Sequence, residues 1–189
     1  MTQTEDHLYI NKVVQGDSNA YAYLVNKYKR MAFTIALRIH RNTEDAEDTT
    51  QESFIKAFKK IHSFKKDSKF STWLYTIVYR TAIYNLRKKS IPTEQINEDI
   101  IQNKYTVDED FDDELKTQQQ LKLVNEAINK LPKMESLLIT LFYKNENSVL
   151  EIKEITGLSE SNIKVKLYRA RNKMKKQLKN AIEAASNNA

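Results

Sequence analysis

The segment SVLEIKEITGLSESNIKVKLYRARNKMKK, residues 148–176, predicts a short helix, a turn and a longer helix. Ser148 followed by Glu151 is a capping-box pattern for the start of the short helix. Gly157 ends that helix, since glycine readily adopts the left-handed conformation of a helix terminus, and Ser159 is the expected cap of the longer helix. This order is typical of a helix-turn-helix, whose second helix enters the major groove of DNA.

The longer helix is strongly basic. Residues 161–176 carry seven positive charges and no negative charge, while apolar residues recur at steps of four, three and four. At helical spacing, cations flank the apolar seam on both sides, as phosphates flank a groove. Asn162, Lys166 and Arg169 also carry donors suited to base edges. A basic helix near a chain end can also simply complement its own dipole, so this motif alone indicates DNA binding and no more.

Composition favours a wholly helical protein, because the 189 residues include only two glycines and two prolines. The chain has no cysteine, which excludes disulfides and thiolate metal sites. The net charge of +6 is unevenly spread: residues 91–116 carry −7, which leaves +13 on the rest. A basic body of this kind favours a polyanionic partner.

We therefore predict an all-α protein with two small helical domains, residues 1–90 and 115–180, joined by an acidic flexible linker at 91–114. Residues 181–189 are expected to be a frayed tail. The expected core face of the helix that follows residue 43 consists of Phe54, Ile55, Phe58 and Ile61.

Aromatic and basic residues alternate in FKKDSKFSTWLYTIVYRTAIYNLRKK, residues 64–89. This mixture suits an unstacked nucleic-acid strand, which needs cations for its backbone and aromatic faces for its bases. Trp73 lies on the apolar stripe and is expected in the core, whereas Tyr75 and Tyr79 are the better candidates for the surface.

Two motif blocks resemble a known family. The segments EDAEDTTQESFIKAF (44–58) and FKKDSKFSTWLYTIVYRTA (64–82), with IKVKLYRARNKM (163–174) downstream, are similar to bacterial RNA polymerase sigma factors of the extracytoplasmic-function (ECF) group. The resemblance implies a subunit that brings promoter specificity to core polymerase. It implies no catalytic residue, cofactor, metal or small-molecule substrate, and no direct insertion into a membrane.

The resemblance also implies three sets of contact residues. Docking on the coiled coil of the largest polymerase subunit falls to Asp45, Glu47, Asp48, Gln51 and Glu52. Capture of the melted −10 strand falls to Lys65, Lys66, Ser68, Lys69, Phe70, Tyr75, Tyr79, Arg80, Arg87 and Lys88. Recognition of the −35 duplex falls to Ser161, Asn162, Lys164, Lys166, Arg169, Arg171 and Lys173. The second-largest subunit is a further implied partner, and the family often has an anti-sigma factor.

The chain departs from the family pattern at a few positions. Arg80 stands where many members have Asn, and Tyr84 stands where many have Asp, so the preferred −10 bases are open. Thr49 replaces the usual Leu, and KMESLLITLF (133–142) lacks the customary Arg and Tyr.

Two other functions are compatible with parts of the chain. A stand-alone helix-turn-helix regulator would explain the C-terminal half but not the aromatic-basic helix. An enzyme with a carboxylate-bridged metal on Glu44, Glu47, Asp48 and Glu52 would need a Glu-x-x-His pair, and no histidine has Glu three residues before it. The N-terminus lacks a signal-peptide pattern and the longest uncharged run, 70–79, is too short to span a bilayer, so we expect a cytoplasmic protein.

Overall fold

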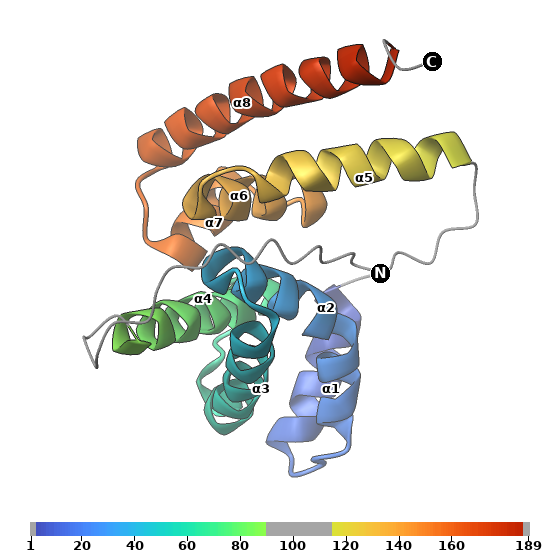
Figure 1. Ribbon diagram of the computed structural model, residues 1–189. Helices are drawn as coiled ribbons and strands as arrows, with labels where there is room; N and C mark the ends of the chain where they lie inside the picture. The colour runs from blue at the N-terminus through green and yellow to red at the C-terminus, as the bar shows by residue number, and fades with distance from the viewer. Residues whose placement is uncertain (1–2, 90–114, 187–189) are drawn as a thin grey trace.

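The computed structural model describes residues 3–89 and 115–186, and every regular element in these ranges is helical (Figure 1). The N-terminal unit contains α1 (Gln3–Val14), α2 (Ala20–His40), α3 (Thr43–Lys60), the 3₁₀ turn η1 (Ile61–Ser63) and α4 (Phe70–Lys89). The C-terminal unit contains α5 (Leu115–Asn129), α6 (Lys133–Ile139), the π-helical turn η2 (Thr140–Lys144), α7 (Val149–Thr156) and α8 (Glu160–Ser186). The predicted all-α class is confirmed.

Two predictions concern the ends of the units. The acidic linker expected at 91–114 lies outside the described residues. The frayed tail expected from residue 181 is wrong as far as Ser186, because α8 continues to that residue. Between Lys179 and Ser186 the helix contains three alanines and no glycine or proline, so nothing there interrupts it.

The helix-turn-helix forms as the sequence predicts. The Ser148 hydroxyl accepts a hydrogen bond from the Glu151 amide at 3.2 Å, and the Glu151 carboxylate accepts one from the Ser148 amide at 2.7 Å. Gly157 ends α7 with a φ of 74°, and the Ser159 hydroxyl accepts a hydrogen bond from the Asn162 amide at 3.3 Å. These local bonds satisfy amides that have no partner within their own helix, which places α8 directly after the turn.

The core face of α3 is only partly as predicted. Phe54 and Ile61 are buried, but Ile55 and Phe58 are exposed. The buried face of α3 is built mainly from smaller residues, which are Ala46, Thr49, Thr50, Ser53 and Ala57. Small side chains let α2 and α4 approach α3 closely, so the largest apolar residues do not mark the inner face here.

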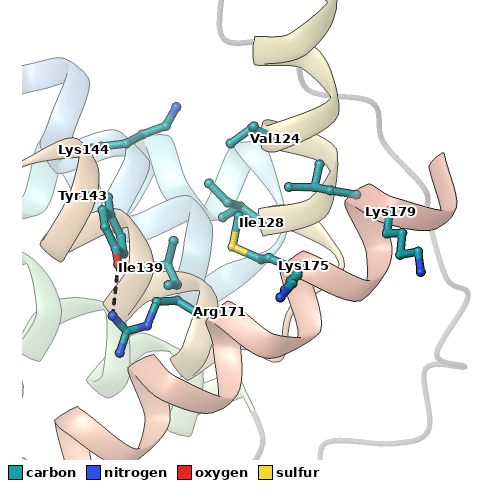
Figure 2. A pocket seen from close by; sticks show the side chains of 10 residues that line it. Val124, Ile128, Ile139, Tyr143, Lys144, Arg171, Lys175 and Lys179 are labelled. Carbon is teal, nitrogen blue, oxygen red and sulfur yellow. Dashed lines mark hydrogen bonds between the residues drawn. The ribbon is translucent and has the colours of Figure 1, made fainter. Parts of the chain in front are cut away.

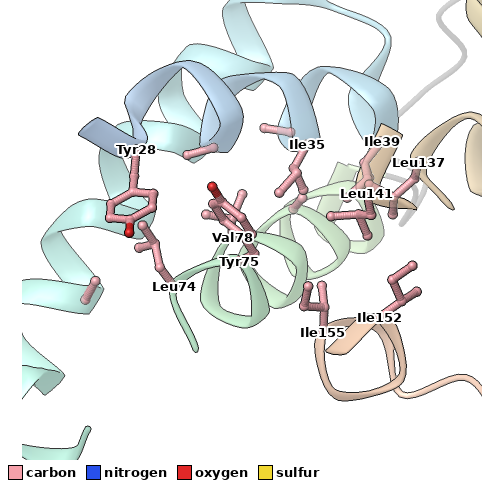
Figure 3. Packing of buried hydrophobic residues seen from close by; sticks show 14 of the residues in the cluster. Tyr28, Ile35, Ile39, Leu74, Tyr75, Val78, Leu137, Leu141, Ile152 and Ile155 are labelled. Carbon is pink, nitrogen blue, oxygen red and sulfur yellow. The ribbon is translucent and has the colours of Figure 1, made fainter. Parts of the chain in front are cut away.

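The two units share one continuous apolar core. Helix α4 packs against α7, and α2 packs against α6. Figure 3 shows Ile39 of α2 beside Leu137 and Leu141 of the C-terminal unit. Ile152 and Ile155 of α7 belong to the same buried cluster. The apolar faces of both units are thereby removed from water together.

Two arginines at the end of α2 bind the C-terminal unit. The Arg41 guanidinium donates to the carbonyl oxygens of Asn129 and Leu131 at 2.6 Å each. Arg38 is buried and donates to the Thr140 hydroxyl at 3.2 Å and to the Asn129 side chain. Burial lowers the pKa of Arg38 to about 10, so this arginine remains charged at neutral pH. Its charge is therefore held within the contact between the units.

A buried histidine makes stability depend on pH. His40 Nε2 lies 2.9 Å from the Thr49 hydroxyl, which also accepts from Asn85 at 3.2 Å. Burial is the main influence that lowers the pKa of His40 below its ordinary 6.5; Lys89 and Lys133 act in the same direction, and Asp45 opposes them. The unfolded chain therefore binds this proton more readily than the folded chain does.

We expect the free energy of unfolding to fall as the pH drops through 6.5 and to level off below the lowered pKa. Urea unfolding of His40→Gln at pH 7.5 and 5.5 should show a smaller difference than the unchanged chain. His62→Gln, a change at an exposed histidine, is the matched control. Equal pH dependence in His40→Gln and the unchanged chain would contradict this assignment.

Candidate nucleic-acid interface

The outer face of α3 is acidic at its start and apolar at its end. We call it the α3 strip, and its exposed members are Glu44, Glu47, Asp48, Gln51, Ile55 and Phe58. Their spacing of three and four residues places them along one side of the helix. The sequence analysis predicted Ile55 and Phe58 to be buried. Their position on the same side of the helix as Asp48 and Gln51 could have indicated that they are exposed. The strip combines charge with exposed apolar area, a combination that suits a protein partner.

Two of the five predicted docking residues are engaged inside the unit. Asp45 forms an ion pair with Lys89. Glu52 accepts a hydrogen bond from Asn85 at 2.8 Å and pairs with Lys56 at 2.7 Å, and these bonds, Asn85 first, lower the pKa of Glu52. Glu47, Asp48 and Gln51 are exposed. Asp45 and Glu52 thus link α3 to α4, and their contact with polymerase stays a prediction.

The predicted stacking residues are divided between core and surface. Phe70 and Tyr75 are each 2% exposed, so contact of either ring with a base is excluded in this structure and both predictions are corrected. Phe70 lies 5.5 Å from Trp73 and 5.6 Å from Phe64, measured between ring centroids, which makes it part of an aromatic cluster. Tyr79 is half-buried, and burial raises its pKa.

Helix α4 also presents an exposed aromatic residue. Tyr84 is 61% exposed, and it shares one side of the helix with the exposed side chains of Arg80, Arg87 and Lys88. Lys56 Nζ lies 5.8 Å from the Tyr84 ring centroid. Tyr84 was not among the predicted −10 contact residues, although it lies four residues from both Arg80 and Lys88. We call these four residues the α4 face.

The loop before α4 presents the remaining basic residues of this unit. Lys65, Lys66 and Lys69 are exposed, and Ser68 is half-buried beside them. Lys66 adopts a left-handed φ of 64° and its Nζ donates to Asn11 at 2.8 Å. Lys69 forms an ion pair with Glu151 of α7 at 2.9 Å. The loop lies at the start of α4, about 21 Å along the helix from Tyr84 at 1.5 Å per residue.

Helix α8 runs along one edge of the molecule, away from the N-terminal unit (Figure 1). Of the predicted −35 residues, Ser161, Asn162, Lys164 and Arg169 are exposed and Lys166 is half-buried. Arg171 lies 3.4 Å from the Tyr143 hydroxyl, and Lys173 pairs with Glu135 at 2.8 Å. Arg171 and Lys173 thus contact neighbouring helices, whereas the exposed Ser161, Asn162, Lys164 and Arg169 lie in the first three turns of α8.

An apolar groove lies between α5 and α8 (Figure 2). Val124, Ile128 and Ile139 form part of its wall, and Arg171 and Lys175 stand at its border. The groove lies on the inner side of α8, because Ile163 and Leu167 on that side are buried. It is thus separate from the outward face of α8.

Metal-ligating clusters and membrane-spanning helices are two further features to consider in the part of the chain that the structure describes. No group of three or more His, Asp or Glu side chains could hold a metal ion there. No helix in the same part combines the length and apolar character that crossing a bilayer requires.

Comparison with known proteins explains why these surfaces occur on one chain. The family description Sigma-70 region 2 matches residues 24–91, and Sigma-70, region 4 matches residues 121–174. The ECF RNA polymerase sigma factor SigW of Bacillus subtilis is 32% identical over 178 residues, which cover 90% of this chain and 95% of SigW. The chain belongs to the ECF sigma factors. This sigma factor therefore directs promoter-specific initiation by core RNA polymerase, and a stand-alone regulator is not favoured.

Other relatives agree with this assignment. The ECF RNA polymerase sigma-E factor of Haemophilus influenzae is 32% identical, over 89% of this sigma factor and 93% of that protein. The sigma factor RpoE of Bartonella quintana, solved with the anti-sigma factor NepR, superposes with a TM-score of 0.61 at 22% identity, over 84% of this chain and 96% of that one. CnrH, solved with the cytosolic domain of CnrY, has a TM-score of 0.63 at 19% identity, over 93% and 97% of the two chains. These two structures show the shared fold.

Proposed function

We propose that this sigma factor works through three separate surfaces. The α3 strip docks on core polymerase, the α4 face and the 65–69 loop hold the melted −10 strand, and the outer face of α8 contacts the −35 duplex. The observation that carries this proposal is the exposure of the α3 strip, with Glu47, Asp48, Ile55 and Phe58 at the surface. A protein that only binds duplex DNA has no use for such a strip.

The chemistry of each surface suits its proposed partner. The α4 face places Tyr84 between cations, and a single strand offers bases to stack and phosphates to neutralise. The apolar groove between α5 and α8 remains available for the second-largest polymerase subunit, because its wall is apolar and it faces away from the DNA-contacting side. An anti-sigma factor, as found in the solved complex of RpoE with NepR, is a further partner that we propose.

In this proposal the polymerase supplies all catalytic groups, and the sigma factor supplies promoter position and strand capture. It acts in the cytoplasm, where core polymerase and the chromosome are. The residues of the three surfaces contact DNA or protein, and none of them is assigned a role in making or breaking a covalent bond.

Run-off transcription tests the proposal. Core polymerase is combined with a library of upstream fragments, with and without this protein. We expect discrete transcripts only when the protein is present, and alignment of their upstream sequences gives the −10 and −35 elements. Absence of such transcripts, together with tight binding of the protein alone to duplex fragments, would contradict the proposed function.

A further inference from the structure

The most outward side of α8 is uncharged. With 3.6 residues per turn, Ser161, Val165, Tyr168 and Asn172 lie opposite the buried residues Ile163, Leu167 and Ala170. All four are exposed: Val165 is 47% and Tyr168 62% exposed. Exposed cations border this row, with Lys164 on one side and Arg169 on the other. We call the four residues the uncharged strip.

The charged edges and the uncharged centre of this side of α8 suit different parts of a DNA groove. Cations at the two edges are placed for the phosphates that border a groove, and the strip between them faces its floor. A helix solvated on its outer side would gain nothing from a β-branched apolar residue, which lowers helix propensity slightly. In the major groove, by contrast, the apolar feature of a base edge is the thymine methyl group.

We propose that Val165 is a specificity-determining residue that packs against the methyl group of one thymine in the −35 duplex. This inference rests on the proposed function. Val165 lies in the second turn of α8, and the N-terminal part of a recognition helix is the part that contacts base edges. The preference would therefore come from apolar contact at this position, in addition to hydrogen bonds from its polar neighbours.

The test removes only the methyl group of a thymine base and leaves its hydrogen-bonding groups in place. In the upstream element mapped by run-off transcription, each thymine of either strand is replaced in turn by deoxyuridine, and holoenzyme binding is measured. We expect one replacement to weaken binding about fourfold, the effect of burying one methyl group. Val165→Ala should abolish that response, and Val165→Thr, which keeps one methyl group, should retain part of it.

Leu150→Ala is the matched control, since Leu150 is an exposed apolar residue of α7 outside the strip. The Leu150→Ala holoenzyme should lose binding at the same deoxyuridine position, and by the same factor, as the unchanged holoenzyme. Transcription from discrete start sites with no position sensitive to deoxyuridine, or with equal sensitivity in Val165→Ala, would overturn this inference alone. Absence of promoter-directed transcription would instead refute the proposed function.

A second, independent observation concerns the loop that precedes α4. Lys66, Asp67 and Lys69 line a cleft together with Glu146, Glu151 and Glu154 of the C-terminal unit, and Lys69 is paired with Glu151 across it at 2.9 Å. Burial opposes ionisation of Glu151, but hydrogen bonds from Lys69 and Ser148 outweigh this effect and lower its pKa. Glu151 thus offers Lys69 an anionic oxygen, as a phosphate of a strand would.

We infer that contact between the two units masks the single-strand surface of the isolated protein. A strand that binds Lys69 must displace Glu151, and the Arg41 bonds to Asn129 and Leu131 oppose separation of the units. This inference also rests on the proposed function. Polymerase would then favour the open form by binding both units at a greater separation.

Glu151→Gln with Arg41→Asn tests the masking. Glutamine can keep the capping box of α7, and asparagine tolerates the left-handed backbone of residue 41. We expect the double variant to bind a single-stranded −10 oligonucleotide at least about tenfold more tightly than the unchanged protein, because three charge-assisted bonds are lost or weakened. Small-angle scattering should show a larger radius of gyration.

Glu160→Gln, which breaks the Lys153–Glu160 ion pair inside the C-terminal unit, is the control and should change neither property. An unchanged affinity in the double variant, with or without expansion, would overturn the masking inference. If even the holoenzyme fails to bind the −10 strand, the proposed function itself is wrong.

Discussion

Association with core RNA polymerase should be lost when Glu47 and Asp48 are both replaced by lysine. The two carboxylates are exposed at the acidic end of the α3 strip, and their reversal places positive charge against a surface that is complementary to negative charge. We expect at least about 100-fold weaker binding, equivalent to about 3 kcal/mol. Fluorescence anisotropy with labelled sigma factor and purified core polymerase measures this loss.

The control must carry the same change in charge. Glu126→Lys with Glu160→Lys reverses two acids of the C-terminal unit that lie outside the cleft between the units, and this variant should bind polymerase nearly normally. Helicity should be unchanged in both double variants, because substitutions at exposed positions have small effects on stability. Polymerase binding that survives Glu47→Lys with Asp48→Lys would show that α3 is not the docking helix.

Phe70→Ala should lower the free energy of unfolding by about 3–5 kcal/mol, the usual cost of truncating a buried aromatic residue. Phe70 is 2% exposed and its ring centroid lies 5.6 Å from that of Tyr28, so its removal leaves a cavity among α2, α4 and the preceding turn. Urea unfolding followed by circular dichroism measures the change. A loss below about 1 kcal/mol would mean that the ring is not part of the core.

Tyr84→Ala is the matched aromatic truncation on the same helix. Tyr84 is 61% exposed, so stability should change by no more than about 0.5 kcal/mol. Binding of the melted −10 strand by holoenzyme should weaken by about 1–3 kcal/mol, the usual value of one base–aromatic stack. The two variants thus separate a core role from a contact role, and a reversed pattern would restore Phe70 as the contact residue.

Local sequence patterns were sufficient wherever the interaction is short in range. The capping box of Ser148, the left-handed Gly157 and the cap at Ser159 each depend on residues within four positions. Such bonds form in the same way whatever packs against the helix. The two sigma-factor motif blocks were likewise visible in the chain itself, and family matches to residues 24–91 and 121–174 confirm the resemblance.

The sequence-based predictions of which residues are buried were wrong where a helix packs against neighbours on more than one side. Helix α4 contacts α2, α3 and α7, so Tyr75 is buried although it lies off the stripe of Trp73 and Ile77. Helix α3 shows the opposite case, since its small residues face inward and leave Ile55 and Phe58 at the surface. Apolar periodicity predicts one buried side and gives no indication of a second.

The sequence by itself determined the helices, their caps, the helix-turn-helix and the family of this protein, because periodicity, capping and motif spacing act along the chain. Only the tertiary structure decided which aromatic rings are free for DNA and that Lys69 is bound to Glu151. The two residues of that ion pair are 82 positions apart, and no local pattern relates them. Exposure and long-range pairing depend on how helices pack, which is a property of the whole fold.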